Sequence, residues 1–140
     1  MPLKLQIKPG ERFILGRAVV TNSGPATELV VEGDVPVLRG KDVLPLKDAE
    51  TPCQRIYVAI QLMYVDHPDT DSHRALFTEL VEDVLRAAPT TMRFLGPITD
   101  EVVGGRYYQA LKLARALIDY EAELLTSNPR NNKSASKRSI

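Results

Sequence analysis

One stretch constrains the fold of this chain more than any other: residues 98–126, ITDEVVGGRYYQALKLARALIDYEAELLT. Apolar or ring side chains recur in it at alternating intervals of four and three, which is the period of a helix with one apolar face. The stripe comprises Val103, Tyr107, Ala110, Ala114, Leu117 and Leu124, with Leu111, Ile118 and Leu125 beside it. We therefore predict one long helix that buries this stripe against the rest of the chain.

Three details of this predicted helix are informative. Thr99 can cap its start, because a threonine hydroxyl can accept a hydrogen bond from the first turn. Gly104 and Gly105 do not follow a predicted strand and lack the lysine of a phosphate loop, so they indicate a kink or close helix packing. Glu121 falls on the stripe, at a position where an apolar residue is expected.

Residues 1–47 have the pattern of short β-strands. Leu3, Leu5 and Ile7 alternate with polar residues, which is the period of a half-buried strand. Turn signals rich in Gly, Pro and Asn recur roughly every eight to twelve residues. Further strands are expected at 12–15, 18–21, 27–32, 36–39 and 43–46. This pattern predicts a small β-sandwich or an open, barrel-like unit.

Two further helices are predicted between the strands and the long helix. Thr51-Pro52 is a typical helix start, so the apolar run at 56–65 is interpreted as a buried helix, although its periodicity also allows a buried strand. Residues 72–88 form a clear amphipathic pattern. Pro89 and the Gly96-Pro97 pair are expected to break the chain before the long helix. The fold class is therefore α+β with about three helices, the last one long.

Composition sets the outer bounds. The chain has 140 residues with 18 basic and 18 acidic side chains, so its net charge gives no argument for nucleic acid or membrane. No run approaches the ~18 apolar residues of a membrane span. Polar residues interrupt the N-terminus where a signal peptide would have an apolar core, which indicates a cytoplasmic protein. We expect one α+β domain over 1–127, with a β unit at 1–47 and a helical part at 51–126, and a disordered basic tail at 128–140.

No constellation of catalytic or metal-binding residues stands out. The single cysteine, Cys53, is interpreted as a small buried apolar residue, because it lies outside any motif. His67 and His73 lie near several aspartates, but the spacing matches no metal-ligand pattern. These carboxylates and Ser72 are better interpreted as caps of the following helix. No nucleophile signature is present, so neither an enzyme nor a cofactor or metal is predicted.

The candidate binding residues are basic, with one aromatic. Lys4 and Lys8 share the outward face of the first strand, and Arg12 and Arg17 follow closely, so this group could track a phosphate backbone. A solvated strand face protected by lysines is the alternative. Tyr107 is expected in the core, whereas Tyr108 could stack on a base. The candidate RNA-binding set is Lys4, Lys8, Arg12, Arg17, Arg39, Lys41 and Tyr108.

Four stretches of the chain resemble the FlbT family of flagellin post-transcriptional regulators from alphaproteobacteria. They are MPLKLQIKPGERFILGRAVVTN at the start, VLRGKDVLP at 37–45, TPCQRIYVAIQLMYVD at 51–66 and RYYQALKLARALIDYEAELL at 106–125. The resemblance covers nearly the whole chain in order. It implies a non-enzymatic, cytoplasmic regulator of flagellum biogenesis.

The resemblance also implies a mechanism and partners. Family members are understood to bind the 5′ untranslated region of flagellin mRNA, repressing translation and promoting decay of the messenger. The implied partners are this leader RNA, flagellin and the flagellar protein FlaF; self-association is left open. The alternative is a protein-binding flagellar assembly factor, associated with flagellin or a chaperone, that acts on mRNA indirectly.

Overall fold

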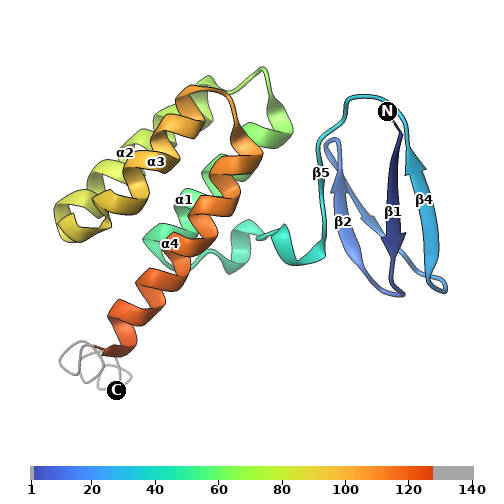
Figure 1. Ribbon diagram of the computed structural model, residues 1–140, viewed down its shortest axis with the longest axis horizontal. Coiled ribbons are helices and arrows are strands. Elements are labelled where there is room, and N and C mark those ends of the chain that lie inside the picture. Colours follow the sequence, from blue (N-terminus) through green and yellow to red (C-terminus); the bar gives the residue numbers. More distant parts are fainter. Residues whose placement is uncertain (1, 128–140) are drawn as a thin grey trace.

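The computed structural model describes residues 2–127, and it confirms an α+β protein in which strands precede helices. The strands are β1 Leu3–Ile7, β2 Arg12–Leu15, β3 Ala18–Thr21, β4 Thr27–Val31 and β5 Val37–Leu38. The helices are α1 Pro52–Asp66, α2 Asp71–Ala87, α3 Met92–Val103 and α4 Tyr107–Ser127, with short 3-10 turns η1 Gly40–Asp42, η2 Leu46–Asp48 and η3 Pro89–Thr91. The strands gather at one end of the molecule and the helices at the other (Figure 1). The predicted basic tail at 128–140 lies outside the described residues.

The strands form two small sheets. β1 pairs antiparallel with β4, and β2 pairs antiparallel with both β3 and β5. The predicted alternation of β1 is confirmed for Leu5 and Ile7, which are buried while Lys4 and Gln6 are exposed, but Leu3 at the start of the strand is 46% exposed. Leu5 and Ile7 share a small core with Phe13 of β2. This core lies between strands of both sheets; closure into a barrel or sandwich stays a prediction.

The strand expected at 43–46 does not form. Leu44 donates its amide to the side chain of Gln61 in α1 and accepts a hydrogen bond from it, each at 2.9 Å. The backbone of this segment is therefore satisfied by a helix side chain instead of a neighbouring strand.

α1 confirms the helical interpretation of the apolar run. Thr51 accepts a hydrogen bond from the Gln54 amide at 3.1 Å, and the Gln54 side chain accepts one from the Thr51 amide at 3.1 Å. This reciprocal pair is a capping box. Residues 56–61 are all buried, which explains the missing periodicity, since a helix covered on all sides needs no polar face.

α2 starts one residue earlier than predicted, and its cap differs. Phe77, Val81 and Val84 are buried, so the amphipathic pattern is confirmed. The expected capping by carboxylates or Ser72 is wrong: the cap position is Thr70, with no side-chain cap bond.

The largest correction concerns residues 98–126, which are not one helix. α3 begins at Met92 and contains both Gly96 and Pro97, so this pair does not break the chain and Thr99 is not a cap. The break falls instead at Gly104-Gly105. Four α-helices therefore replace the predicted three or so within residues 2–127.

The local geometry at the break explains its position. The Arg106 amide donates to the Glu101 carbonyl at 2.8 Å, and the Gly105 amide donates to the Val102 carbonyl at 3.0 Å. Gly105 has φ 76°, which glycine adopts without steric cost. These bonds are those of a Schellman motif, which satisfies the last carbonyls of α3 and ends the helix.

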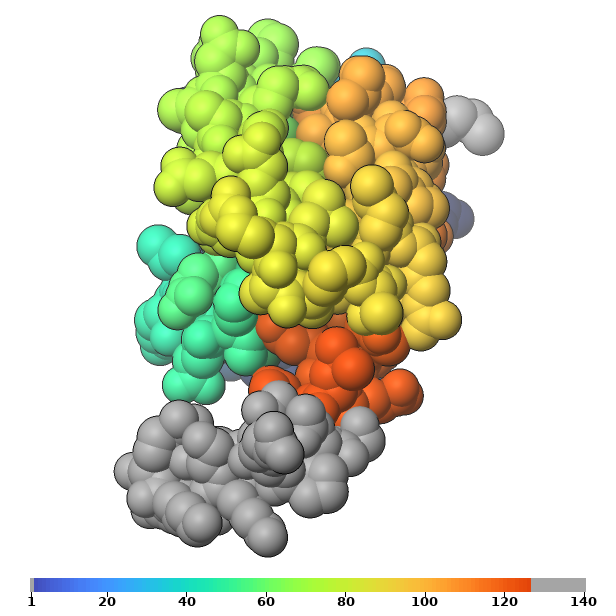
Figure 2. Space-filling model, turned by 90° about the vertical axis from the view of Figure 1, so that its left-hand side faces the viewer, coloured from blue at the N-terminus to red at the C-terminus, as the bar shows by residue number. Residues whose placement is uncertain are grey.

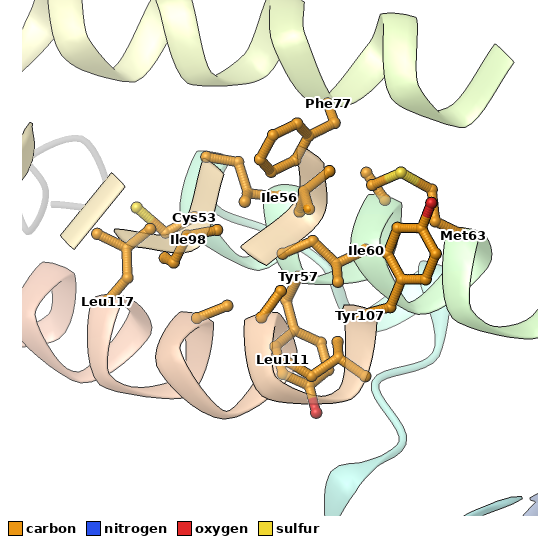
Figure 3. Close-up of a cluster of buried hydrophobic side chains, with 14 of the residues drawn as sticks. Cys53, Ile56, Tyr57, Ile60, Met63, Phe77, Ile98, Tyr107, Leu111 and Leu117 are labelled. Atoms are coloured by element: carbon orange, nitrogen blue, oxygen red, sulfur yellow. The ribbon is translucent and has the colours of Figure 1, made fainter. Parts of the chain in front are cut away.

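The core lies where α1, α2, α3 and α4 meet (Figure 3). The predicted stripe is confirmed from Tyr107 to Leu117, whose members are at most 5% exposed. Upstream of the break the phase is wrong: Val103 is 71% exposed and Val102 is buried in its place. The new helix starting at Tyr107 has its own rotation, so the two halves of the stripe do not continue one another.

Glu121 has a structural role that accounts for its place on the stripe. Its Oε2 accepts a hydrogen bond from the Cys53 amide at 3.2 Å, in the first turn of α1. A carboxylate is favoured there because the amides at a helix start lack partners within the helix and carry partial positive charge. Burial, with Glu121 nearby, raises the pKa of the Cys53 thiol to about 12, so the interpretation of Cys53 as a buried, inert residue holds.

The helical end presents a face of its own. α2 and α3 make up most of it, with the beginning of α1 and the later turns of α4 beside them (Figure 2). Among residues 2–127, none of the helices has the length and apolar character needed to cross a membrane.

Candidate nucleic-acid interface

The segment between the last strand and α1 is held against the helices by its backbone. Tyr57 donates its hydroxyl to the Asp42 carbonyl at 2.6 Å, and Gln61 pairs with Leu44 as described above. From α4, Arg115 donates to the Lys41 carbonyl at 3.0 Å. α1 and α4 together therefore fix the position of η1 next to the strands.

A cleft of about 300 Å³ opens at this junction, and we call it the junction cleft. Its walls come from β5, η1, α1 and α4, and its lining residues are Leu38, Lys41, Asp42, Tyr57, Tyr108, Leu111, Lys112 and Arg115. They include three cations and one carboxylate. In a chain of zero net charge, this is a local excess of positive charge.

Two of the three cations of the junction cleft lie over tyrosine rings. The Arg115 guanidinium lies 4.7 Å from the centre of the Tyr57 ring, and Lys112 Nζ lies 4.8 Å from the centre of the Tyr108 ring. Within residues 2–127, none of Lys41, Lys112 and Arg115 forms an ion pair with a carboxylate. Their charge is therefore available to an anionic ligand.

Burial sets the chemistry of the inner tyrosine. It raises the pKa of Tyr57, although the nearby Arg115 acts in the opposite direction. Tyr57 is therefore a neutral hydrogen-bond donor near neutral pH, because an unperturbed tyrosine already has a pKa of roughly 10. Its ring serves as a platform for Arg115 at the inner wall of the cleft.

A second hollow adjoins the junction cleft, and we call it the strand groove. It has a volume of about 490 Å³ and is lined by Lys8, Glu11, Arg39, Gly40, Lys41 and Asp42. Lys41 and Asp42 line both hollows, so the two form one surface.

Arg39 is neutralised in the strand groove. Its guanidinium contacts the two Glu11 oxygens at 2.8 and 3.1 Å. The Arg39 hydrogen bond, helped by the Lys8 amide, lowers the pKa of Glu11 to about 2. Arg39 also donates to the carbonyl of Gln6. This arginine therefore holds the groove together, and Lys8 and Lys41 are its two cations without an ion-pair partner in the described part of the chain.

The structure brings together four of the seven residues predicted to bind RNA. Lys8, Arg39 and Lys41 line the strand groove, and Tyr108 joins Lys41 in the junction cleft. Tyr107 is buried, as predicted for a core residue.

The other three predicted residues lie elsewhere. Lys4 is on the outer face of β1, and Arg12 borders a separate small hollow. Arg17 Nε forms an ion pair with Asp66 at 3.2 Å. Lys4 lies near the start of β1, whereas Lys8 follows its end. Arg12 and Arg17 belong to β2 and to the β2–β3 turn, which are part of the other sheet.

Lys112 and Arg115 were missed by the sequence analysis. Their spacing from Tyr108, four and seven residues, places all three on one side of α4. The signal lay in that spacing, which a search for clustered basic residues does not detect.

Asp66, the last residue of α1, has a structural role. Asp66 contacts His73 Nε2 at 2.7 Å in addition to Arg17, which ties the β2–β3 turn to α1 and α2. Among the described residues, no group of three or more His, Cys, Asp or Glu side chains could hold a metal ion.

The fold and the junction cleft define a class of small α+β proteins that carry a candidate binding site, made of cations and an aromatic ring, between the strands and the helices. Comparison with protein-family models identifies the family, because the model described as "Flagellar protein FlbT" matches residues 3–125. The chain belongs to the FlbT family.

Named relatives agree with this assignment. A "Probable flagellum biosynthesis repressor protein FlbT" of Rhodopseudomonas palustris is 36% identical over 126 residues, covering 90% of this chain and 99% of the relative. FlbT 1 of Bradyrhizobium diazoefficiens is 39% identical over 125 residues, covering 89% and 85%. The "Flagellum biosynthesis repressor protein FlbT" of Caulobacter vibrioides is 35% identical over 127 residues, covering 89% and 90%. These names describe repressors, not enzymes, and they support a regulatory role in flagellum biosynthesis. No solved structure matches the chain.

Proposed function

We propose that this protein is a cytoplasmic post-transcriptional regulator of flagellin synthesis that binds the 5′ untranslated region of flagellin mRNA, repressing translation and promoting mRNA decay. The relatives' names support the regulatory part. The observation that carries the RNA-binding part is the junction cleft, which is lined by the exposed Tyr108 and by three cations that have no carboxylate partner within residues 2–127. Unpaired cations with an aromatic ring are the combination that single-stranded RNA sites use.

The charge of this surface predicts how binding depends on salt. Four cations, Lys8, Lys41, Lys112 and Arg115, line the two adjoining hollows without a carboxylate partner among the described residues. If each contacts one phosphate, log affinity falls against log salt with a slope of about −3, since each contact to single-stranded RNA contributes roughly −0.7.

A matched pair of double variants tests this proposal. Lys41→Ala with Lys112→Ala removes two charges from the junction cleft, and should weaken leader-RNA binding and flatten the slope by about 1.4. Lys4→Ala with Arg12→Ala removes two exposed charges outside both hollows, and should leave the slope unchanged. Titrations of labelled leader RNA at several salt concentrations measure both. A flatter slope in the Lys4/Arg12 variant, with no change in the Lys41/Lys112 variant, would place the site on the strands. Absence of leader-RNA binding by the wild type would reject direct binding of the RNA by this protein.

An apolar hollow at the other end of the helices favours the second candidate function, a protein-binding module that acts on mRNA indirectly. It has a volume of about 150 Å³ and is lined mainly by Pro52, Val84, Ala87, Ala88 and Leu124, with Asp83 and Glu121 at its polar positions. Flagellin and FlaF are the partners to test. Leader-RNA binding that requires added flagellin would select this candidate.

A further inference from the structure

We infer that the junction cleft takes an unpaired base of single-stranded RNA, stacked on Tyr108, with Lys41, Lys112 and Arg115 on its neighbouring phosphates. This inference rests on the proposed function and specifies which form of RNA the site accepts.

Tyr108 has the properties of a stacking platform. It lies in the first turn of α4 and is 37% exposed, whereas the preceding Tyr107 is 5% exposed. Its ring packs at a tilt near Tyr64, with 6.1 Å between the ring centres. In the described part of the chain its hydroxyl makes no hydrogen bond, while those of Tyr57, Tyr64, Tyr107 and Tyr120 all do. The ring therefore packs near Tyr64, lines the cleft and is held by no hydrogen bond of its own among the described residues.

Lys112 occupies the place that a base would take. Its Nζ lies 4.8 Å from the centre of the Tyr108 ring, in a cation–π contact that is weak at an exposed site. A base can displace this flexible side chain, and the ammonium group then moves to a phosphate. The positive charge then stays within the cleft, and the contact of the Tyr108 ring with the Lys112 ammonium is replaced by a larger contact with the base.

Arg115 is preorganised for the same ligand. Its stacking on Tyr57 and its hydrogen bond to the Lys41 carbonyl fix the guanidinium. A guanidinium has five N–H donors, so the single bond to the carbonyl leaves several for phosphate oxygens. Lys41, on the same segment of backbone, places a second charge beside it.

The shape of the cleft selects an unpaired base. At about 300 Å³ it lies at the small end of ligand pockets. The bases of a duplex are stacked inside the helix and present only their edges, so none of them can lie flat on Tyr108. A duplex can contact the cations of the rim only through its phosphates.

Two variants at one position separate stacking from charge. Tyr108→Leu removes the ring and keeps an apolar side chain, whereas Tyr108→Phe keeps the ring. We expect Tyr108→Leu to weaken binding of a single-stranded leader oligonucleotide by about 5- to 150-fold, the range that corresponds to stacking of one base. Its salt slope should match the wild type, because no charge is lost. Tyr108→Phe should stay within about twofold of the wild type.

The probes are a single-stranded leader oligonucleotide, the same oligonucleotide paired with its complement, and a single-stranded version carrying 2-aminopurine. Single strand should bind better than duplex, and wild-type protein should quench 2-aminopurine at one position while Tyr108→Leu should not. Equal binding of single strand and duplex, or wild-type affinity in Tyr108→Leu, overturns the inference while leaving RNA binding in place. Failure of the wild type to bind either probe overturns the proposed function and the inference together. Equal melting temperatures of the two variants and the wild type control for folding.

Discussion

The helices of this protein enclose a large hydrophobic core, whereas the strands enclose a small one. The larger core is built mainly from α1, α2, α3 and α4, and includes Ile56, Ile60, Leu111 and Leu117. The fully buried core between the sheets has three members, Leu5, Ile7 and Phe13. Because hydrophobic stabilisation grows with the apolar area removed from water, the helices carry most of the stability. The strands depend on the contacts that dock them.

The docking contacts are themselves divided between apolar and polar groups. Ile14 of β2 and Leu38 of β5 belong to the larger core. Tyr57, Gln61 and Arg115 fix the η1–η2 segment through its backbone. The β unit is therefore a small attachment to a helical body.

The largest effect is expected in the helical core. Leu117→Ala should lower the free energy of unfolding by roughly 2–5 kcal/mol, because Leu117 is fully buried and the variant leaves a cavity. Urea denaturation measures the change. Leu113→Ala, on the same helix but 39% exposed, is the control and should cost far less. Similar losses in the two variants would show that the phase of α4 is wrong.

A smaller effect is expected in the core between the sheets. Ile7→Val should cost roughly 0.5–1.5 kcal/mol, because it removes one buried methylene. Hydrogen exchange should show faster exchange in β1 and β2 with little change in α1 and α4. Val30→Thr in β4, where Val30 is 53% exposed, is the matched control. Equal acceleration in strands and helices would mean that the two regions unfold as one unit.

The smallest effect concerns acid. Glu11 has a pKa of about 2 in the folded protein, below its ordinary 4.5. The folded state therefore binds fewer protons, and the stabilisation from Arg39 is present above about pH 4.5 and lost as the pH falls through about 2.

The corresponding variant is Glu11→Gln, which should remove this part of the acid dependence. Denaturation curves between pH 2 and 5 measure it, and strand amides should respond more than helix amides. Glu32→Gln, at an exposed carboxylate without an ion-pair partner among the described residues, serves as the control. An unchanged pH profile in Glu11→Gln would mean that Arg39 does not stabilise the strand groove.

Local patterns predicted much of the fold. The Thr51-Pro52 start, the amphipathic α2 and the stripe from Tyr107 to Leu117 all follow from interactions within one segment. The Gly104-Gly105 break has the same origin and was misinterpreted: a glycine pair at the end of an apolar run is also a signal for a helix C-terminus. Because one helical period was assumed for all of residues 98–126, the glycine pair was not interpreted as a helix end.

Features that depend on distant contacts could not be predicted. Glu121 is explained only by the start of α1, 68 residues away in sequence. The assignment of β1 and β2 to different sheets places Arg12 and Arg17 on other strands than Lys8, which follows β1 and lines the strand groove. The junction cleft combines side chains from β5, η1, α1 and α4, and no local pattern indicates that these segments meet.

The composite walls of the junction cleft link binding to folding. The site exists only while η1 and the strands are docked on α1 and α4, so a ligand of the cleft binds the docked form and not the undocked one. Such a ligand stabilises the docked form by RT ln(1 + [L]/Kd), about 2.7 kcal/mol when its concentration is 100 times Kd. Conversely, a disturbance that releases η1 and the strands removes Leu38, Lys41 and Asp42 from the walls of the cleft. The fraction of clefts that is occupied by ligand thus depends on the equilibrium by which η1 and the strands dock on α1 and α4.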